Sequence, residues 1–514
     1  MKNLFILILL AFVLPLTTNA QISSDLLKKA NAGDAAAMNL VGKAYMYGNG
    51  VKQSYEEAIQ WFTKAANKGY AISMTSIGNI YYRTSDYSKA KEWYEKAVKA
   101  GDEDAKCWLG YLYEYGYGVE VNYTKAFELY KQLADKGMSE AMASIGHLYQ
   151  LGHGVPQDYG KALEWYQRAA DKGSSAAMYH MAELYQLGHG VPQDYSKAIE
   201  WYQRAGNKGD YGGWNEIGNI YADGNGVPRD YAKAMEWYKK AADKGNISAM
   251  YNIGWLYMQG YGVTQSYTQA ADWYRKAAEL GDALAMWRLG NLYYSGSGVS
   301  QDYTKAMEWY KKAANKGGIA SMRNIGYLYY NGDGVAQDYA KAMDWFKKAA
   351  NEGDVEAINR IGIMYYKAQG VTQDYAKAME QFKKAADKGY PTGINNVGAL
   401  YYRGHGVPQD YKKAFEYCTK ASEMGNALSM GRLGEMYYYG YYVTQDYNKA
   451  FDFFYKAATS KNEPSGNAMN MLSTCYRFGY GTTKDLEKAE YWLKKAQEAG
   501  NDKANAIKQL LEQQ

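Results

Sequence analysis

The chain repeats itself every 36 residues, and this periodicity limits its possible folds more than any other feature of the sequence. The segments "GHGVPQDYGKALEWYQRAADKG" at 152–173 and "GHGVPQDYSKAIEWYQRAGNKG" at 188–209 are identical at 18 of 22 positions. An active site needs one arrangement of residues, whereas a repeat array grows by stacking similar units around one continuous core. The sequence therefore predicts a single repeat architecture for most of the 514 residues.

A tyrosine that stands three residues before an alanine marks each unit. These marker tyrosines are Tyr55, Tyr87, Tyr123, Tyr159, Tyr195, Tyr231, Tyr267, Tyr303, Tyr339, Tyr375, Tyr411 and Tyr447, and Leu486 takes the same place in the last unit. Every step from Tyr87 to Tyr447 is 36 residues, whereas the first step is 32 and the last is 39. Both exceptions fall between expected helices, where a chain tolerates changes in length.

Each marker residue is expected to begin an amphipathic helix. Small and aromatic residues recur behind it at helical spacing, as in Ala162, Tyr166 and Ala169. A Ser, Asp or Asn precedes all thirteen markers, and these residues are good helix N-caps. The equivalent of Ala162 is alanine in every unit, which predicts a close contact between helices that a larger side chain would disrupt.

Another helical pattern, "AMASIGHLYQLG" at 141–152, precedes the marker in each unit. Its apolar residues share one face, and the glycines that follow, such as Gly152 and Gly154, suit a left-handed helix end and a tight turn. Helices of about 13 residues are marginal in isolation, so stacking on neighbours must stabilise them. We therefore expect an all-α superhelical solenoid of about thirteen two-helix units of 36 residues.

The unit "AMASIGHLYQLGHGVPQDYGKALEWYQRAADKG" resembles the Sel1-like repeat, a subclass of the tetratricopeptide-like helical repeats. The resemblance covers roughly residues 35–498 and recurs thirteen times. It implies a right-handed α/α superhelix that serves as an adaptor or scaffold for protein complexes, and bacterial members of this kind are often exported. Some exported relatives carry a cysteine pair in each repeat. This chain lacks those pairs, so their disulfide stabilisation and any activity proposed for them do not transfer.

The sequence also predicts how the ends of the chain are organised. Residues 1–20 read as a cleaved secretory signal, with Lys2, an apolar run from Leu4 to Leu16 and a small Ala20 before the cleavage point. A cap segment at 21–34, the repeat array at 35–500 and a polar capping helix at 501–514 are expected to follow. We expect an exported protein, periplasmic or secreted, that does not span a membrane.

The sequence has none of the common motifs of catalytic, metal or nucleotide sites. The sequence contains no His-Glu-x-x-His, Gly-x-Ser-x-Gly, Walker-type or Cys-x-x-Cys motif, so we expect neither an enzyme nor a cofactor. The net charge of +5 is small and evenly spread, which argues against nucleic acid as a partner. The three cysteines, Cys107, Cys418 and Cys475, replace helix residues and are expected to be buried thiols. A metal site built from His147, His153 and His189 is disfavoured, because nothing predicts convergent ligands.

Function is expected where the repeats differ. The position two residues before the Gly-x-Gly glycine carries five tyrosines in successive units, Tyr294, Tyr330, Tyr366, Tyr402 and Tyr438. Further candidates on the same face are Trp255, Trp287, Tyr327 and Arg323. By the resemblance this face lines a concave groove, where tyrosines suit a protein or peptide partner, including a cell-envelope component. Two interpretations stay open for the five tyrosines, a binding surface or packing between adjacent units.

Two other functions remain as alternatives. The tyrosine-rich face would also suit a glycan, so a glycan-binding or peptidoglycan-binding envelope protein is the second hypothesis. A hydrolase of cell-wall or lactam substrates is the third, and it lacks any visible nucleophile, base or metal set.

One segment, "GNKGDYGGWNEIG" at 206–218, departs from the helical pattern. Gly212 and Gly213 stand where other units place better helix formers. The segment predicts either a soft joint between two arms of the array or merely a weak helix start.

Overall fold

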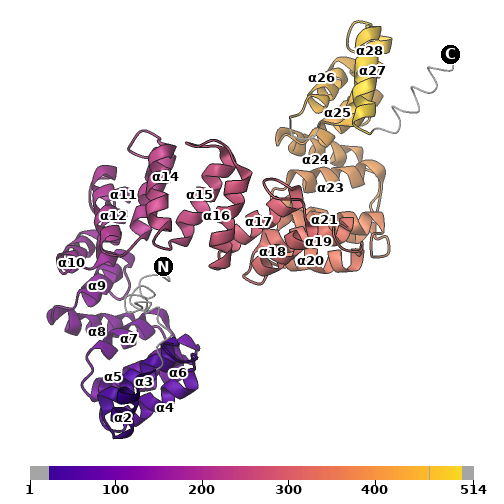
Figure 1. Ribbon diagram of the computed structural model, residues 1–514. Helices are drawn as coiled ribbons and strands as arrows, with labels where there is room; N and C mark the ends of the chain where they lie inside the picture. Colours follow the sequence, from indigo (N-terminus) through magenta and orange to yellow (C-terminus); the bar gives the residue numbers. More distant parts are fainter. Residues whose placement is uncertain (1–21, 462–463, 501–514) are drawn as a thin grey trace. The chain divides into compact units, whose positions relative to one another are not determined.

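The computed structural model describes residues 22–461 and 464–500, and within these ranges it contains 27 α-helices and no strand. Helix α2 (Ser24–Asn31) precedes thirteen helix pairs (Figure 1). The first helices of the pairs are α3 (Ala35–Tyr47), α5 (Ala71–Arg83), α7 (Asp104–Tyr115), α9 (Ser139–Leu151), α11 (Ser175–Leu187), α13 (Gly212–Asp223), α15 (Ile247–Gln259), α17 (Ala283–Ser295), α19 (Ile319–Asn331), α21 (Val355–Lys367), α23 (Pro391–Arg403), α25 (Ala427–Tyr439) and α27 (Gly466–Phe478).

The second helices all begin at the marker residues. They are α4 (Tyr55–Ala66), α6 (Tyr87–Lys99), α8 (Tyr123–Asp135), α10 (Tyr159–Asp171), α12 (Tyr195–Asn207), α14 (Tyr231–Ala242), α16 (Tyr267–Glu279), α18 (Tyr303–Ala314), α20 (Tyr339–Asn351), α22 (Tyr375–Asp387), α24 (Tyr411–Glu423), α26 (Tyr447–Ala458) and α28 (Leu486–Glu498). The predicted helical-repeat solenoid is therefore confirmed. The expected signal at 1–20 and capping helix at 501–514 lie outside the described residues.

The helices form two compact units. The N-terminal unit contains α2 to α15 and ends at Ser266, and the C-terminal unit contains α16 to α28 and begins at Tyr267. Within each unit, a first helix packs against the second helix of its own repeat and against the second helix of the preceding repeat. Every repeat therefore depends on its neighbours for burial, as in other stacked-repeat proteins.

The small residues of the repeat lie where helices approach closely. The alanine three residues after the marker is fully buried in all thirteen repeats, as predicted. In most first helices a glycine leaves space for the large side chain of the second helix, whereas α11 and α27 carry Ala182 and Ser473 at this position. A Cβ atom on Gly146 would lie 2.7 Å from the ring of Tyr166, and one on Gly326 would lie 2.6 Å from the ring of Phe346. These distances are too short for an ordinary carbon contact, so glycine is required there.

The helix ends also follow the sequence. Asp158 caps α10 by accepting a hydrogen bond from the backbone N–H of Lys161 at 2.9 Å, and Asn122 caps α8 in the same way through Lys125. Gly152 ends α9 in the left-handed conformation, with φ of 73°. Only α21 among the repeats with a Gly-x-Gly-type loop ends on a different residue, Ala368, with φ of 59°. A left-handed alanine is strained, because its Cβ crowds the backbone.

Two glycines of the segment 206–218, Gly206 and Gly213, have a packing role. Trp214 stands where most other repeats carry methionine, and it is 6% exposed. A Cβ atom on Gly206 would lie 2.1 Å from the Trp214 indole nitrogen, and one on Gly213 would lie 2.4 Å from the Tyr202 carbonyl oxygen. Gly206 and Gly213 therefore make room for the indole and for a close helix contact. The segment lies inside the N-terminal unit, and its proposed role as a soft joint stays a prediction.

The three cysteines lie in the interior of the repeats. Cys107, Cys418 and Cys475 are all free and buried, as expected from their helix positions. Burial raises the pKa of the Cys475 thiol to about 12, so it is protonated and unreactive at neutral pH. Within the described ranges, none of the helices has both the length and the hydrophobicity that crossing a bilayer requires.

Candidate interaction face

The first helices carry one stripe of variable side chains, here called the first-helix face. Its residues lie nine, eight, five and two positions before the left-handed residue that ends the helix. On α19 these residues are Arg323, Asn324, Tyr327 and Tyr330. All four are partly exposed. The face therefore combines contacts to neighbouring repeats with surface that remains open to a partner.

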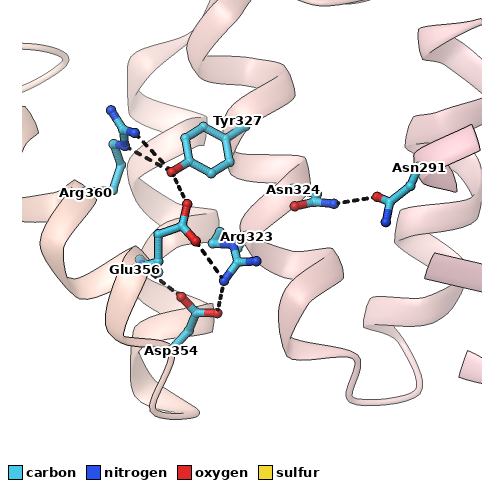
Figure 2. A network of polar contacts seen from close by, with 8 residues as sticks. Asn291, Arg323, Asn324, Tyr327, Asp354, Glu356 and Arg360 are labelled. Atoms are coloured by element: carbon cyan, nitrogen blue, oxygen red, sulfur yellow. Dashed lines mark hydrogen bonds and ion pairs between the residues drawn. The ribbon is translucent and has the colours of Figure 1, made fainter. Parts of the chain in front are cut away.

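Polar side chains of α19 and α21 are joined across the boundary between their repeats (Figure 2). The Tyr327 hydroxyl donates to Glu356 Oε1 at 2.7 Å and accepts from the Arg360 guanidinium at 3.1 Å. Arg323 forms ion pairs with Asp354 at 2.8 Å and with Glu356 at 3.2 Å. These partly buried, charge-assisted contacts fix the side chains in one arrangement.

The network extends to other repeats of the C-terminal unit. The side-chain amides of Asn324 and Asn291 form a hydrogen bond of 3.0 Å, which links α19 to α17 (Figure 2). Asn396 donates to Asn359 at 2.9 Å, which links α23 to α21. Arg432 donates to Asn395 at 2.7 Å, which links α25 to α23. Side chains on five successive first helices thus hold one another in place.

The five predicted tyrosines, called the outer tyrosines, occupy position two of this face and lie next to the loops of the following repeats. All five are partly exposed. Three hydroxyls bond to the middle residue of the next repeat's loop, with distances of 3.0 Å for Tyr294–Asp333, 2.6 Å for Tyr330–Gln369 and 3.1 Å for Tyr366–His405. The rings of Tyr402 and Tyr438 contact Tyr441 and Tyr480 at the same place, with centroids 6.1 and 5.8 Å apart.

The outer tyrosines therefore do pack between repeats, and they also keep exposed surface. Each ring also meets the marker tyrosine of its own repeat, as for Tyr294 and Tyr303 with centroids 5.2 Å apart. Burial raises the pKa of Tyr438 to about 12, so its hydroxyl stays neutral and can donate a hydrogen bond. Whether these rings also bind a partner stays a prediction.

The two predicted tryptophans occupy different surroundings on the same stripe. Trp255 lies five positions before the end of α15 and meets the loop residue Tyr261 edge-on, with centroids 5.3 Å apart. Trp287 lies nine positions before the end of α17, and the Arg288 guanidinium lies 4.6 Å from its ring centroid. Both indoles are partly exposed.

The N-terminal unit has a different set of groups on the first-helix face. Buried Glu114 accepts a hydrogen bond from the Tyr130 hydroxyl at 2.9 Å and lies 3.2 Å from His147 Nδ1 on the next first helix. Tyr166 and Tyr202 donate to Gln150 and Gln186 in the same way, at 2.7 Å each. In these three repeats, the residue two positions before the helix end is therefore the hydrogen-bond acceptor for the buried tyrosine of the second helix.

Acidic groups in the next repeats of this unit are partly or fully buried. His180 Nδ1 lies 2.7 Å from Glu183 on α11. Asp210 is 8% exposed and accepts a hydrogen bond from the backbone N–H of Gly212. Burial raises the pKa of Asp210 to about 6, and it raises that of Glu216 as well. The charge of His180 opposes the effect at Asp210, whereas Glu183 adds to it.

The histidines considered as metal ligands have separate partners. His147 pairs with Glu114, whereas His153 and His189 stack on Tyr123 and Tyr159, with centroids 4.2 and 4.7 Å apart. No group of three His, Cys, Asp or Glu side chains is placed to hold a metal ion in the part of the chain that the structure describes.

Sequence reasoning missed several residues of this face. It followed positions nine, five and two, and so overlooked Arg360 and Arg432 at position eight, although both lie one residue from the stripe it predicted. It also missed the pair Glu114–His147, which joins residues 33 apart. The pair could have been predicted from its spacing, because a carboxylate and an imidazole nearly one repeat apart stand on adjacent first helices.

Comparison with known proteins identifies the repeat. The Sel1 repeat family matches the chain thirteen times, over residues 35–70, 78–102, 103–138, 139–174, 175–210, 215–246, 247–282, 283–318, 319–354, 355–390, 391–426, 427–462 and 466–501. The HRD3B component of an ERAD-associated E3 ubiquitin-protein ligase from Arabidopsis thaliana is 31% identical over 98 residues. That match covers 18% of this chain and only 15% of the plant protein.

A solved structure shows the same architecture. A protective antigen of uropathogenic Escherichia coli strains, described as having the SLR fold, is 31% identical, with a TM-score of 0.58. The match covers 96% of this chain and 98% of that one. A Sel1 repeat protein from Oxalobacter formigenes is 33% identical and matches 47% of this chain and 99% of its own, with a TM-score of 0.41. The chain belongs to the Sel1 repeat family, helical repeat proteins that serve as scaffolds for protein–protein interactions.

Proposed function

We propose that the chain is an exported scaffold that binds an extended peptide or a partner domain along the first-helix face of its C-terminal unit. The observation that carries the proposal is the cross-linked set of Tyr, Arg and Asn side chains on α17 to α25, most of which are partly exposed, whereas Asn359 and Asn395 are buried. Their hydrogen bonds run between repeats, so the groups are already ordered before a partner arrives. Ordering in advance reduces the entropy lost on binding.

The chemistry of the face favours a polypeptide partner. Tyrosine offers a large rigid ring and a hydroxyl at a small entropic cost, and both Tyr and Arg are enriched at protein interfaces. Arg360 and Arg432 donate here to neutral acceptors, a tyrosine hydroxyl and an amide oxygen. Each guanidinium has five N–H donors, so both retain capacity for carbonyl or carboxylate groups of a partner.

The finer parts of the proposal rest on sequence. Export rests on the signal-like residues 1–20, and the concave shape of the binding face rests on the resemblance to tetratricopeptide-like repeats. A periplasmic or extracellular location would expose the face to envelope proteins, and glycans of the cell wall would be the alternative ligand.

Site-specific photo-crosslinking tests the face directly. A benzoylphenylalanine at Tyr330, on α19, would be compared with one at Lys347, an exposed residue of the second helix α20 in the same repeat. After irradiation of living cells of the source organism, we expect one recurrent protein adduct from position 330 and none of that mass from position 347. Circular dichroism melting would establish that both variants remain folded.

A second variant connects the adduct to the face. Arg360→Glu reverses a charge beside Tyr327 and should abolish the adduct at position 330. Equal adducts from positions 330 and 347 would place the binding surface elsewhere. Adducts that are digested by a cell-wall hydrolase, rather than by trypsin, would favour the glycan alternative.

A further inference from the structure

A cavity of about 530 Å³ lies in the N-terminal unit, between the second helices α6 and α8 and the loop 116–122. Its size is in the range of small-molecule sites. The residues that line it and matter to its chemistry are Lys91, Glu92, Tyr113, Glu120, Asn122 and Lys125. None of them belongs to the first-helix face.

The cavity lies between two successive repeats, α5–α6 and α7–α8, that differ from the other repeats at the residues lining it. Four residues after the marker, Lys91 replaces an apolar side chain that eleven other repeats carry, such as Leu163 or Met235. In the loop, Val121 replaces a glutamine. In nine other repeats that glutamine donates its side-chain amide to the carbonyl seven residues earlier, as Gln157 does to Gln150 at 2.9 Å. Val121 has no amide and is 51% exposed.

A third departure leaves a lysine without its usual partner. In ten repeats the lysine two residues after the marker forms an ion pair with the aspartate before the marker, at 2.8 to 3.9 Å. Here Asn122 replaces the aspartate. Lys125 instead donates to the Tyr113 hydroxyl at 2.9 Å, and it has no carboxylate within ion-pair distance among residues 22–461 and 464–500. A cation therefore lines the cavity unneutralised.

We propose that this cavity binds a ligand with a single carboxylate, which pairs with the Lys125 ammonium as the capping aspartate does in ten other repeats. The proposal is independent of the function proposed above. Lys125 and the Tyr113 hydroxyl lie together, so a carboxylate at the ammonium would also be within reach of a second donor. Lys91 also lines the wall, and its charge is paired with Glu95 at 2.9 Å.

The glutamates of the cavity restrict the ligand. Glu92 and Glu120 also line it, so phosphate, sulfate or a dicarboxylate, with more negative charge, would meet stronger repulsion than a monocarboxylate. Val119 and Val121 also line the cavity, and valine offers apolar surface to the remainder of the ligand. An N-acylated amino acid or the C-terminal end of a short peptide has this combination of one carboxylate and a small apolar body.

Ligand-observed saturation-transfer NMR on the full-length mature protein tests the proposal. The probes are N-acetylalanine and a panel of N-acetyl dipeptides with free carboxyl ends, each compared with its C-terminal amide. We expect saturation transfer to the acids and about tenfold weaker binding of the amides, because a charge-assisted hydrogen bond is lost. Binding of N-acetylalanine alone would indicate a free small acid as the ligand, and tighter binding of the dipeptides would indicate a peptide end.

Two variants and one control separate the cavity from other sites. Asn122→Asp restores the internal ion pair of the other repeats and should weaken binding of the acids about tenfold while preserving the melting temperature. Lys91→Met fills the cavity with the usual apolar side chain and should also weaken it. Asp194→Asn frees Lys197 in a repeat whose corresponding helix carries Leu163 rather than a lysine, and should create no new binding. Unchanged binding in Asn122→Asp, equal binding of acids and amides, or no binding of any acid would overturn the proposal.

Discussion

The two units satisfy the buried side chain of the second helix in different ways, and the difference explains part of the outer-tyrosine pattern. In the N-terminal unit, Tyr130 and Tyr166 donate their hydroxyls to Glu114 and Gln150, two positions before the helix end. In the C-terminal unit the corresponding side chains on α20, α22, α24 and α26 are Phe346, Phe382, Cys418 and Phe454, which need no acceptor. Their repeats carry the outer tyrosines Tyr330, Tyr366, Tyr402 and Tyr438 instead.

The repeat of α17 and α18 shows that the two features can be separated. It has both an outer tyrosine, Tyr294, and a buried tyrosine, Tyr310, whose hydroxyl donates to Asn291 at 2.7 Å. Asn219 accepts from Tyr238 in the same way in the N-terminal unit. An acceptor at position five therefore releases position two for another use. The five outer tyrosines thus stand in repeats whose buried side chain either needs no acceptor or has one at position five, as Tyr310 does.

The largest effect is expected at the acceptor of the N-terminal unit. Glu114→Leu would leave the Tyr130 hydroxyl and His147 without their buried partner, and should destabilise the unit by about 3 kcal/mol. Glu114→Gln reproduces the residue found at positions 150 and 186 and should cost less than half as much. Hydrogen exchange of α7 to α9, followed by mass spectrometry, would measure both. Equal protection in the two variants would contradict the role of Glu114 as an acceptor.

A second comparison concerns two equivalent aspartates. Asp354 pairs with Arg323 at 2.8 Å, whereas Asp210, at the same repeat position, has no such ion pair and its pKa is raised by burial from 3.8 to about 6. Between those pH values the folded chain holds more protons than the unfolded chain, so the free energy of unfolding falls as pH rises and stays lower above about 6.

Asp210→Asn should remove this pH dependence, because Asn keeps the acceptor for Gly212 and carries no charge. We expect the variant to be more stable at neutral pH, with an upper bound of about 3 kcal/mol from the raised pKa. Exchange protection of α12 and α13, compared at about pH 5 and about pH 7.5, would measure the gain. Asp354→Asn is the control and should be destabilising, because it removes a partner of Arg323. A loss of stability in Asp210→Asn would exclude the desolvation argument.

A third prediction converts a repeat with a buried phenylalanine into one with a buried tyrosine and its acceptor. Phe382→Tyr would bury a hydroxyl among Ile363 and Tyr366, in a repeat with no amide or carboxylate at positions five and two, and should cost about 2 kcal/mol. Adding Ile363→Asn supplies the acceptor that Asn291 provides for Tyr310, and should recover most of the loss. The coupling between the two substitutions, measured by thermal melting in a double-mutant cycle, would be near zero if the hydroxyl simply reached water.

The sequence predicted the fold in detail because the residues that determine helix starts, helix ends and close contacts recur in nearly all of the thirteen repeats. The helix starts at the marker residues, the buried alanine after each marker and the left-handed glycines all follow from local chemistry that any single repeat displays. The packing role of Gly206 was not predicted, because the indole of Trp214 that requires this glycine is visible only in three dimensions.

The candidate face was predicted less completely than the fold. Positions nine, five and two were identified, but their partners lie on other repeats, as Glu356 does for Tyr327 and His405 does for Tyr366. Helical periodicity reports which residues share one helix face and not which side chains meet across a repeat boundary. The cavity at Lys125 was missed for a related reason, since its three unusual residues are spread over two repeats.

The smallest predicted effect concerns the end of α21. In both units most first helices end on glycine, but Ala368 ends α21 with φ of 59°, a conformation that costs alanine about 1 kcal/mol. Ala368→Gly should relieve this strain, and the greater freedom of glycine in the unfolded chain offsets part of the gain, so we expect a net stabilisation of about 0.5 kcal/mol or less. Gly332→Ala, at the end of α19, is the reciprocal change and should destabilise by about 1 kcal/mol. Because each repeat is stabilised by its neighbours, exchange protection of α21 and α22 would reveal the change more clearly than global melting. If both substitutions were neutral, the ends of the first helices would be held by stacking rather than by their own backbone geometry.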